Sequence, residues 1–277
     1  MLDEFILSAL KEDIGDGDHT SLSCISDQEQ GRAQLEVRQD GIIAGVDVAK
    51  RIYEIYDSSL SMEIVKKDGD SVLKGDIVFI LTGSAQSILT TERVVLNIMQ
   101  RMSGIATKTR KLVNQISHTN AELLDTRKTT PGIRFLEKKA VLIGGGSNHR
   151  FGLFDMIMIK DNHVDFAGGI QQAITKTKEY LKNQNKGLKI EVEVRSIDEL
   201  NQVLLVGGVD RIMLDNFSPS EIRKALKLIP KGYETEASGG ITEANIVDYA
   251  ETGIKYISVG ALTHSVVSLD LSLKALF

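Results

Sequence analysis

The chain has 277 residues and a net charge of -5, from 33 lysines and arginines against 38 aspartates and glutamates. It therefore lacks the basic field that drives binding to nucleic acid or to an anionic membrane surface, so we expect neither partner, and any anion site must be local. The N-terminus begins acidic, and no apolar run approaches the roughly 20 residues that span a bilayer. The single cysteine, Cys24, fits a reducing compartment. We therefore expect a soluble, cytoplasmic protein.

The first hundred residues predict a small β-rich module. Short β-like runs at 31–47 and 61–82 are broken by Asp-Gly and Lys-Gly turns. The segment 68–76 is similar to the hairpins of lipoyl-type domains, but its turn lacks a lysine flanked by methionines, which disfavours a carrier role. Residues 90–111 then have the apolar spacing of a long amphipathic helix that joins this module to the rest of the chain.

From residue 121 onward, strand and helix patterns alternate. Six apolar or β-branched runs predict parallel strands, at 121–125, 156–160, 189–194, 211–215, 234–237 and 256–259. Six or more such units favour closure into a TIM-like barrel, with an open doubly wound sheet as the alternative.

Helix boundaries in this part carry their own signals. Ser196 with Glu199 and Ser218 with Glu221 predict capping boxes, the second followed by a proline at the first helical position. Thr242 is interpreted as a further N-cap and Gly253 as a helix stop.

The carboxyl ends of the predicted strands are polar almost throughout. In a barrel of this class these ends form the active site, and here they comprise Arg127, Lys128, Lys160, Glu193, Asp215, Ser238, Gly239, Gly240 and Gly260. The successive strand ends carry first cations, then carboxylates and then glycines, and core packing alone does not explain this order. The pattern predicts a site for a small polyanion.

The glycines at the last strand ends allow close approach of backbone N–H groups to a phosphate. Glu193 and Asp215 suit either oxygen ligation of a divalent cation or the positive charge that develops on a sugar, so sugar-phosphate chemistry is favoured. Glu191 should face the same way as Glu193 and share its task. We interpret His149 as a hydrogen-bond donor to an anionic substrate and His163 as structural.

Ordered motifs along nearly the whole chain resemble those of the quinolinate phosphoribosyltransferase family. They lie at 12–15, 40–45, 92–93, 96–97, 103–107, 125–129, 148–150, 160–163, 191–193, 214–216, 238–241 and 258–264. The resemblance implies an N-terminal α/β sandwich domain of residues 1–110, joined by the tail 266–277. It also implies a TIM-like barrel with an incomplete strand set at 111–265. The implied unit is a homodimer, with hexamers left open, in which Arg93 acts in the neighbouring subunit's site.

The implied reaction joins quinolinate to phosphoribosyl pyrophosphate in de novo NAD biosynthesis, giving nicotinate mononucleotide, carbon dioxide and pyrophosphate with Mg²⁺ as cofactor. Lys128, Lys160, Glu193 and Asp215 would be catalytic, with Glu193 and Asp215 also the metal ligands. Substrate binding would fall to Arg93, Arg127, Lys128, His149, Arg150, Lys160, Ser238, Gly239, Gly240, Gly260 and His264. Arginine suits the two adjacent carboxylates of quinolinate because its planar donors pair with them bidentately.

Three other functions stay open at this point. A paralogous phosphoribosyltransferase found beside molybdate-transport genes has the same fold but an uncertain acceptor, and the set Arg127, His149 and Arg150 favours a dicarboxylate instead. A Schiff-base aldolase would use Lys160 as its nucleophile. A non-catalytic sensor would bind phosphoribosyl pyrophosphate without turnover.

Overall fold

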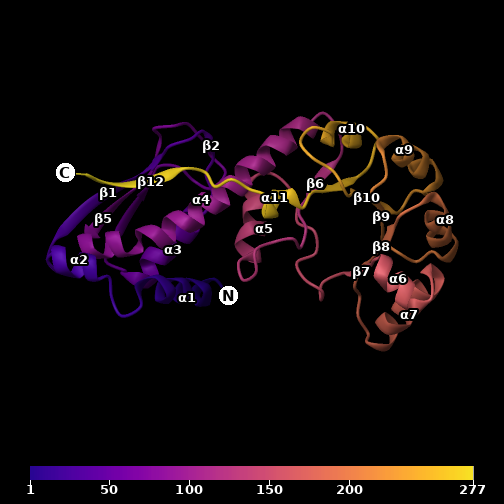
Figure 1. Cartoon of the computed structure of the whole chain (residues 1–277), viewed down its shortest axis with the longest axis horizontal. Coiled ribbons are helices and arrows are strands. Elements are labelled where there is room, and N and C mark those ends of the chain that lie inside the picture. The colour runs from indigo at the N-terminus through magenta and orange to yellow at the C-terminus, as the bar shows by residue number, and fades with distance from the viewer. Residues whose placement is uncertain (277) are drawn as a thin grey trace. The chain divides into compact units, whose positions relative to one another are not determined.

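The computed structural model describes residues 1–276 (Figure 1). The chain divides into two compact units. The first comprises Met1–Arg110, Phe135–Gly145 and the described residues from Val266 onward, and the second comprises Lys111–Arg134 and Gly146–Ser265. The sequence predicted a single boundary between residues 110 and 111, which would place residues 135–145 in the second unit. These residues group with the first unit instead. No helix in the described part of the chain is long and apolar enough to cross a membrane.

The first unit is built on a four-stranded antiparallel sheet of order β12-β1-β5-β3. Its strands are β1 (Gln30–Val37), β3 (Ser61–Ile64), β5 (Ile77–Ser84) and β12 (Leu271–Leu276), and β2 (Gly41–Ile42) pairs separately with β4 (Ser71–Val72). The helices are α1 (Leu2–Ile14), α2 (His19–Cys24), α3 (Val46–Tyr56), α4 (Ala85–Ile116) and α5 (Arg134–Ile143). Because β12 pairs with β1, the C-terminal segment returns to the first sheet.

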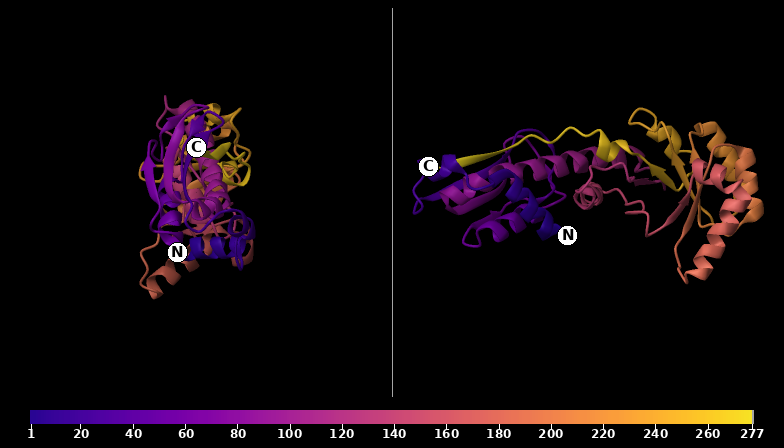
Figure 2. Two further views of the ribbon diagram at one scale, coloured as in Figure 1. Left: turned by 90° about the vertical axis from the view of Figure 1, so that its left-hand side faces the viewer. Right: turned by 60° about the horizontal axis from the view of Figure 1, so that its bottom comes forward.

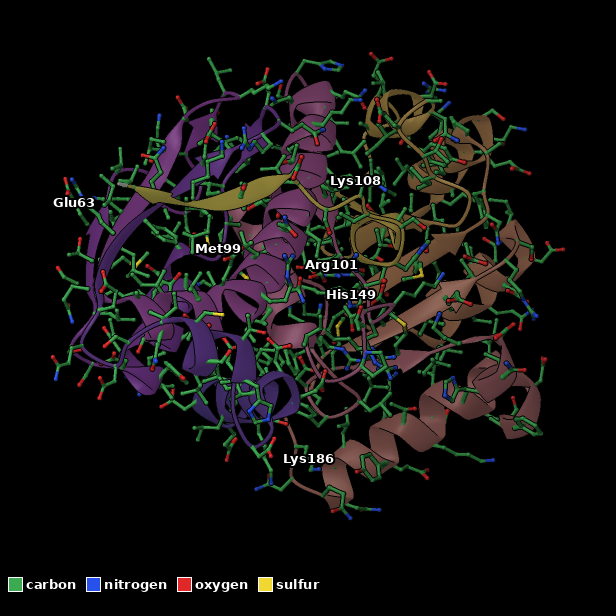
Figure 3. The ribbon with its side chains drawn as sticks, turned by 60° about the vertical axis from the view of Figure 1, so that its left-hand side comes forward. Glu63, Met99, Arg101, Lys108, His149 and Lys186 are labelled. Atoms are coloured by element: carbon green, nitrogen blue, oxygen red, sulfur yellow. The ribbon has the colours of Figure 1, made fainter. Side chains whose placement is uncertain are left out.

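The core of the first unit follows the sequence pattern. Ala33, Leu35 and Val37 alternate on the buried face of β1, as expected for a sheet with one covered face. Met99 on α4 is fully buried, whereas Glu63 is exposed on the edge strand β3 (Figure 3). Helix α4 was predicted at 90–111, and it extends beyond both predicted ends.

The second unit contains a six-stranded parallel sheet of order β6-β11-β10-β9-β8-β7. The strands are β6 (Glu122–Leu124), β7 (Ile157–Ile159), β8 (Ile190–Val194), β9 (Arg211–Asp215), β10 (Glu234–Ser238) and β11 (Tyr256–Ser258). The helices are α6 (Asp161–Ala167), α7 (Ile170–Asn183), α8 (Ile197–Val206), α9 (Pro219–Leu228), α10 (Ile246–Ala250) and α11 (Ala261–His264). In Figures 1 and 2, α7, α8 and α9 lie along one face of this sheet.

This strand order confirms the TIM-like barrel with an incomplete strand set. The strands follow one another around the sheet, and the first, β6, pairs with the last, β11, whereas a doubly wound sheet would reverse direction at a central switch point. Among residues 1–276, β7 is hydrogen-bonded only to β8, so the barrel has an open seam. Ser147 forms an isolated parallel bridge with Leu124 on β6, where a further strand would otherwise stand.

The capping predictions met different outcomes. Ser218 and Glu221 form the predicted box, and Pro219 opens α9. Ser196 caps α8, accepting from the Glu199 N–H, but the Glu199 carboxylate accepts from the backbone N–H of Arg195 instead of closing the box.

Two predictions around α10 were wrong. The N-cap is Asn245 and not Thr242, because the Asn245 amide oxygen accepts the Thr242 N–H and closes a turn before the helix begins. The helix ends at Ala250, so Gly253 lies in the turn that follows it.

Candidate active site

Lys160 and Glu193 meet at the carboxyl ends of two neighbouring strands. Parallel pairing places Ile159 beside Val192, so the next residues on each strand, Lys160 and Glu193, are also neighbours. Their Nζ and Oε2 atoms are 2.6 Å apart. The backbone N–H of Lys160 donates to Nδ1 of His163, which is the structural role expected for that histidine.

Asp215, at the end of β9, belongs to the same group. Partial burial, and then the charge of Glu193, raise the pKa of Asp215, while Lys160 and the amide of Asn216 oppose that rise. Two carboxylates that repel each other beside one lysine form a site that still favours added positive charge.

The loop after β10 lies directly beside Asp215. Ser238 pairs with Asp215 in the sheet, and Asn216 donates its backbone N–H to the carbonyl of Ser238. Asn216 is left-handed, with φ of 57°, and Gly239 has φ of 90°. A side chain on Gly239 would overlap Asn216, so this close approach of two loops requires glycine. Gly240, the third residue of the predicted set, is exposed and has φ of 64°.

Gly260, which follows β11, is packed against Lys128 and His264. A Cβ atom at Gly260 would lie 2.9 Å from Cδ of Lys128 and 3.1 Å from the ring of His264. Thr263 donates its hydroxyl to the carbonyl of Lys128, which fixes this backbone. Three residues predicted for substrate binding are therefore neighbours.

Arg127 and Arg150 form a second cationic group. The Nε atom of Arg127 is buried and has no hydrogen-bond partner among residues 1–276. Burial, and then the charge of Arg127, lower the pKa of Arg150, so the two guanidinium groups are close enough to repel. Arg150 donates from Nη1 to the carbonyl of Met156. An anion between the arginines would relieve their repulsion.

Arg150 also borders a cavity of about 350 Å³ between β7 and helices α6 and α7. Its walls are mainly apolar, with Met156, Met158 and Ile159 among them. Its size suits a small organic ligand, but Lys160, Glu193 and Asp215 do not line it. The cavity therefore adjoins the arginine group and does not coincide with the carboxylate group.

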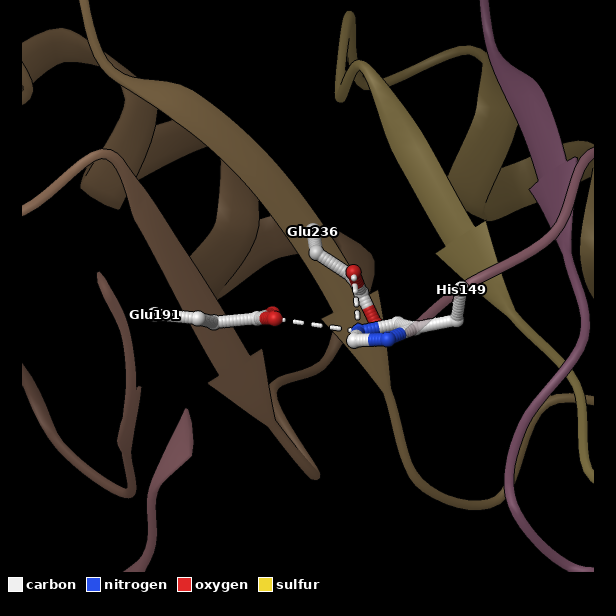
Figure 4. A group of neighbouring side chains, drawn as sticks. All are labelled: His149, Glu191 and Glu236. Atoms are coloured by element: carbon white, nitrogen blue, oxygen red, sulfur yellow. Dashed lines mark ion pairs between the residues drawn. The ribbon is translucent and has the colours of Figure 1, made fainter. Parts of the chain in front are cut away.

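His149 lies in a buried ionic cluster (Figure 4). Its Nε2 atom is 3.0 Å from Oε2 of Glu191 and 3.4 Å from Oε2 of Glu236, and both glutamates are fully buried. Burial alone would lower the pKa of His149, but the contacts of its Nε2 atom with the two glutamate carboxylates outweigh burial and raise the pKa to about 9. Burial and the charge of Glu236 raise the pKa of Glu191 to about 7.

Arg211 completes the cluster from the first position of β9. It donates from Nη1 to Glu236 at 3.0 Å, and from Nε and Nη2 to Glu234. The backbone nitrogen of Arg150 lies 2.6 Å from Nδ1 of His149 and favours an unprotonated Nδ1. The two carboxylates nevertheless favour a protonated His149 ring, because a buried charge pair is stronger than one backbone hydrogen bond.

The same cluster could in principle supply metal ligands, since donor atoms of His149, Glu191 and Glu236 lie within 4.8 Å of one another. We assign it as an ion-pair network instead. A protonated His149 and the guanidinium of Arg211 already supply the positive charge that a metal would bring.

This arrangement changes the interpretation of Glu191, whereas the predicted hydrogen bond from His149 to an anionic substrate stays a prediction. Glu191 and Glu193 do not share one task, because Glu191 pairs with His149 whereas Glu193 pairs with Lys160. His149 has a side chain only 4% exposed and turns Nε2 toward glutamates. Glu236 and Arg211 were missed altogether. The signal available for them was a charged residue inside a strand that is otherwise buried on both faces.

Arg93 lies on α4 in the first unit and is exposed. Its predicted action in a neighbouring subunit involves a second copy of the chain and stays a prediction.

Known proteins of one family are similar to this chain over nearly its whole length. Family models described as quinolinate phosphoribosyl transferase match residues 18–103 (N-terminal domain) and 105–274 (C-terminal domain). A chloroplastic nicotinate-nucleotide pyrophosphorylase [carboxylating] of Arabidopsis thaliana is 46% identical, covering 96% of this chain and 80% of its own. A probable nicotinate-nucleotide pyrophosphorylase of Bacillus subtilis is 44% identical, with coverages of 99% and 91%. The solved nicotinate-nucleotide pyrophosphorylase from Francisella tularensis is 40% identical with a TM-score of 0.93, covering 99% of this chain and 96% of its own. The chain belongs to the quinolinate phosphoribosyltransferase family.

Proposed function

We propose that the chain transfers the phosphoribosyl group of phosphoribosyl pyrophosphate to quinolinate with decarboxylation. The products are nicotinate mononucleotide, carbon dioxide and pyrophosphate, in de novo NAD biosynthesis. One observation in the second unit carries the proposal: Arg127 and Arg150 lie close together, and a buried nitrogen of Arg127 has no partner among residues 1–276. Relatives at 44% to 46% identity bear the pyrophosphorylase name, which favours quinolinate over the acceptor of a paralogous transferase.

The two arginines suit the acceptor because quinolinate carries two adjacent carboxylates. Each guanidinium can donate two parallel hydrogen bonds to one carboxylate. Burial, and then the charge of Arg127, lower the pKa of Arg150, and a bound dianion offsets the second of these causes. The arginines thus select a dicarboxylate over nicotinate, which has one carboxylate.

Lys160, Glu193 and Asp215 suit the transfer step. As pyrophosphate leaves, the ribose acquires oxocarbenium character, and fixed carboxylates beside it stabilise that positive charge. The Lys160 ammonium holds Glu193 in place at 2.6 Å and offers positive charge to the substrates. No covalent nucleophile is required.

Once the ring nitrogen is quaternised, loss of the 2-carboxylate leaves a carbanion next to a positive nitrogen. Decarboxylation then needs chiefly a pocket that does not stabilise that carboxylate with a strong ion pair.

Mg²⁺ fits the carboxylate group. Glu193 and Asp215 offer the oxygen ligands that this ion prefers. Burial, and then the charge of Glu193, raise the pKa of Asp215, and a cation between the two carboxylates would offset the second of these causes. When bound, Mg²⁺ would neutralise charge on the pyrophosphate. The residues that would hold it are Glu193 and Asp215, together with substrate oxygens and water.

We also propose a homodimer in which Arg93 of one subunit acts in the other's site. Arg93 is exposed on α4, and none of the ion pairs or hydrogen bonds among residues 1–276 involves its guanidinium, so it is available to a second chain. A cytoplasmic location suits the exposed thiol of Cys24, which an oxidising compartment would put at risk.

The direct test is an assay of quinolinate consumption with phosphoribosyl pyrophosphate and Mg²⁺, on wild type, Arg127→Ala and Arg223→Ala. Arg223 is an exposed arginine on α9 and serves as the matched control. We expect turnover in wild type and Arg223→Ala and its loss in Arg127→Ala with the fold intact by circular dichroism. A folded wild type that leaves quinolinate unchanged would refute the proposal, and other pyridine acceptors would then be assayed.

A further inference from the structure

The barrel interior of the second unit holds two polar layers. The upper layer is formed by Lys160, Glu193 and Asp215 at the strand ends. Glu191 precedes Glu193 by two residues on β8, so it faces the same side roughly 6.7 Å deeper. Glu191 belongs to the lower layer with His149, Arg211 and Glu236, all of which are buried.

The lower layer is not explained by stability. Removing several charges from water carries a large penalty, and replacing a buried ionic network by apolar side chains is often neutral or stabilising. Nor does the proposed reaction use Glu236 or Arg211. We therefore expect a separate function of Glu236 and Arg211.

The open seam of the barrel suggests that task. Residues 147–150 stand where a strand is missing, and their ladder to β6 consists of the Ser147 bridge alone. Beyond it, the N–H of His149 donates to Oδ1 of Asp125 at 2.8 Å. The ring of His149 then reaches Glu191 on β8 and Glu236 on β10 (Figure 4). Backbone pairing thus holds Ser147, whereas contacts with side chains hold the residues that follow it.

Arg150 follows His149 directly. Its backbone nitrogen is 2.6 Å from the His149 ring, and its guanidinium is tied to protein at the carbonyl of Met156. The place of its remaining donors therefore depends on where the backbone at 149 and 150 is fixed. An arginine that must bind a carboxylate bidentately tolerates little displacement.

We propose that Glu191 and Glu236, the second of which is held by Arg211, are positioning residues that fix Arg150 in the quinolinate subsite through His149. The inference rests on the proposed function and deepens it. According to this inference, the buried lower layer controls acceptor binding although its two glutamates do not touch the substrate.

Glu236 offers the sharpest substitution. Its Oε2 atom faces both Arg211 and His149. Glu236→Gln keeps the shape of the side chain but removes the negative charge that faces both cations, which weakens its hold on His149. Glu234 provides the matched control, because it also accepts from Arg211 at 3.0 Å but has no contact with His149. Glu234→Gln weakens the ion pair with Arg211, and those with Lys189 and Lys255, without touching the pairs of His149.

The experiment measures KM for each substrate, kcat and the thermal midpoint for wild type, Glu236→Gln and Glu234→Gln. We expect Glu236→Gln to raise KM for quinolinate about tenfold or more while KM for phosphoribosyl pyrophosphate stays within about twofold. Both variants should lower the thermal midpoint, but Glu234→Gln should leave both KM values near those of wild type. Equal effects of the two variants on quinolinate KM would overturn the proposal.

A double-mutant cycle with Arg150→Ala separates positioning from general loosening. If Glu236 acts through Arg150, adding Glu236→Gln to Arg150→Ala should change quinolinate KM by less than about twofold, because the residue being positioned is already gone. Fully additive effects would contradict the inference. Should Glu236→Gln not fold, Glu191→Gln enters the same cycle.

Failure of this inference is distinguishable from failure of the proposed function. A wild type that consumes quinolinate, with Glu236→Gln behaving as Glu234→Gln, removes only the positioning role. A wild type without turnover removes the function on which that role depends.

Discussion

Lys160 and Glu193 form an ion pair of 2.6 Å across the ends of two neighbouring parallel strands. Their proximity to Asp215 means that one ammonium partly offsets two carboxylates. The balance of charge among these three side chains decides what the site can bind. A substitution of Lys160, the one cation of the three, should therefore affect activity most.

Lys160→Gln should lower kcat roughly 100-fold or more, because it leaves Glu193 and Asp215 repelling each other and removes positive charge offered to the substrates. Steady-state kinetics at saturating substrates measure the effect. The control is Lys111→Gln, which removes an exposed ion pair to Glu243 in the same unit and should leave kcat unchanged. Unaltered kcat in Lys160→Gln would exclude this lysine from the reaction.

Mixing two inactive variants tests the shared site. If Arg93 acts in the neighbouring subunit, a heterodimer of Arg93→Ala and Lys160→Gln contains one site with neither substitution. Random exchange of subunits should then restore about a quarter of wild-type activity. Each variant subjected alone to the same exchange is the control. If no activity returns although subunits have exchanged, Arg93 acts within its own chain or not at all.

Asp215→Asn should raise the half-saturating Mg²⁺ concentration roughly tenfold or more, since it removes one charged oxygen ligand. Calorimetric titration of phosphoribosyl pyrophosphate at several Mg²⁺ concentrations measures this without relying on turnover. Asp248→Asn, an exposed position on α10, is the matched control and should titrate as wild type. Unchanged Mg²⁺ dependence in Asp215→Asn would remove it from the ligand set.

Stability should fall as pH rises through the titration of His149. Its pKa in the folded state is about 9, above the ordinary 6.5, so the folded state holds this proton more tightly. The stabilisation is complete below about pH 6.5 and is lost as pH rises through 9, amounting to roughly 1–3 kcal/mol. Glu191, with its pKa raised to about 7, acts in the same direction over a lower range.

Urea unfolding of wild type and His149→Gln at several pH values measures this dependence, and His149→Gln should show a smaller decline. His118→Gln is the control, because His118 forms only an exposed ion pair with Glu251 and should keep the wild-type slope. Parallel declines in wild type and His149→Gln would show that other groups control the alkaline limit.

Gly239→Ala should be more damaging than its size suggests. The added methyl overlaps Asn216, and the residue has φ of 90°, so we expect a loss of about 1–3 kcal/mol in the free energy of unfolding. Because Asn216 donates to Asp215, kcat should fall as well. Gly187→Ala, where nothing lies within 4 Å of the new methyl, should match wild type in both measurements. Equal behaviour of the two variants would refute the packing argument.

The fold of the second unit was largely predictable because each strand is a short apolar run. The strand predicted at 211–215 has the observed bounds, and each of the others differs by one residue at one or both ends. Boundaries failed where two polar side chains competed for one turn. The Thr242 hydroxyl looked like a cap, but it donates to Oδ1 of Asn245, as the Thr242 N–H does, instead of accepting a helix N–H.

The site was predictable only in part. Lys160, Glu193 and Asp215 could be placed together because strand ends converge in a parallel barrel. The pairing of His149 with Glu236 could not, because 87 positions in the numbering separate them and no local pattern links a loop histidine to a strand glutamate. Such contacts depend on the packed interior, where the depth of each side chain decides its partner.

The open seam beside β7 also bears on how acceptor preference can change. In a closed barrel the circumference is set by strand number and shear, and altering it breaks a ladder of hydrogen bonds. Here one gap is spanned by side chains, with Arg150 reaching the carbonyl of Met156 across it. The width of this seam is therefore adjustable by single substitutions that leave every backbone ladder intact, and if Arg150 binds the acceptor as proposed, the seam is the natural place to redesign the enzyme for larger aromatic acids.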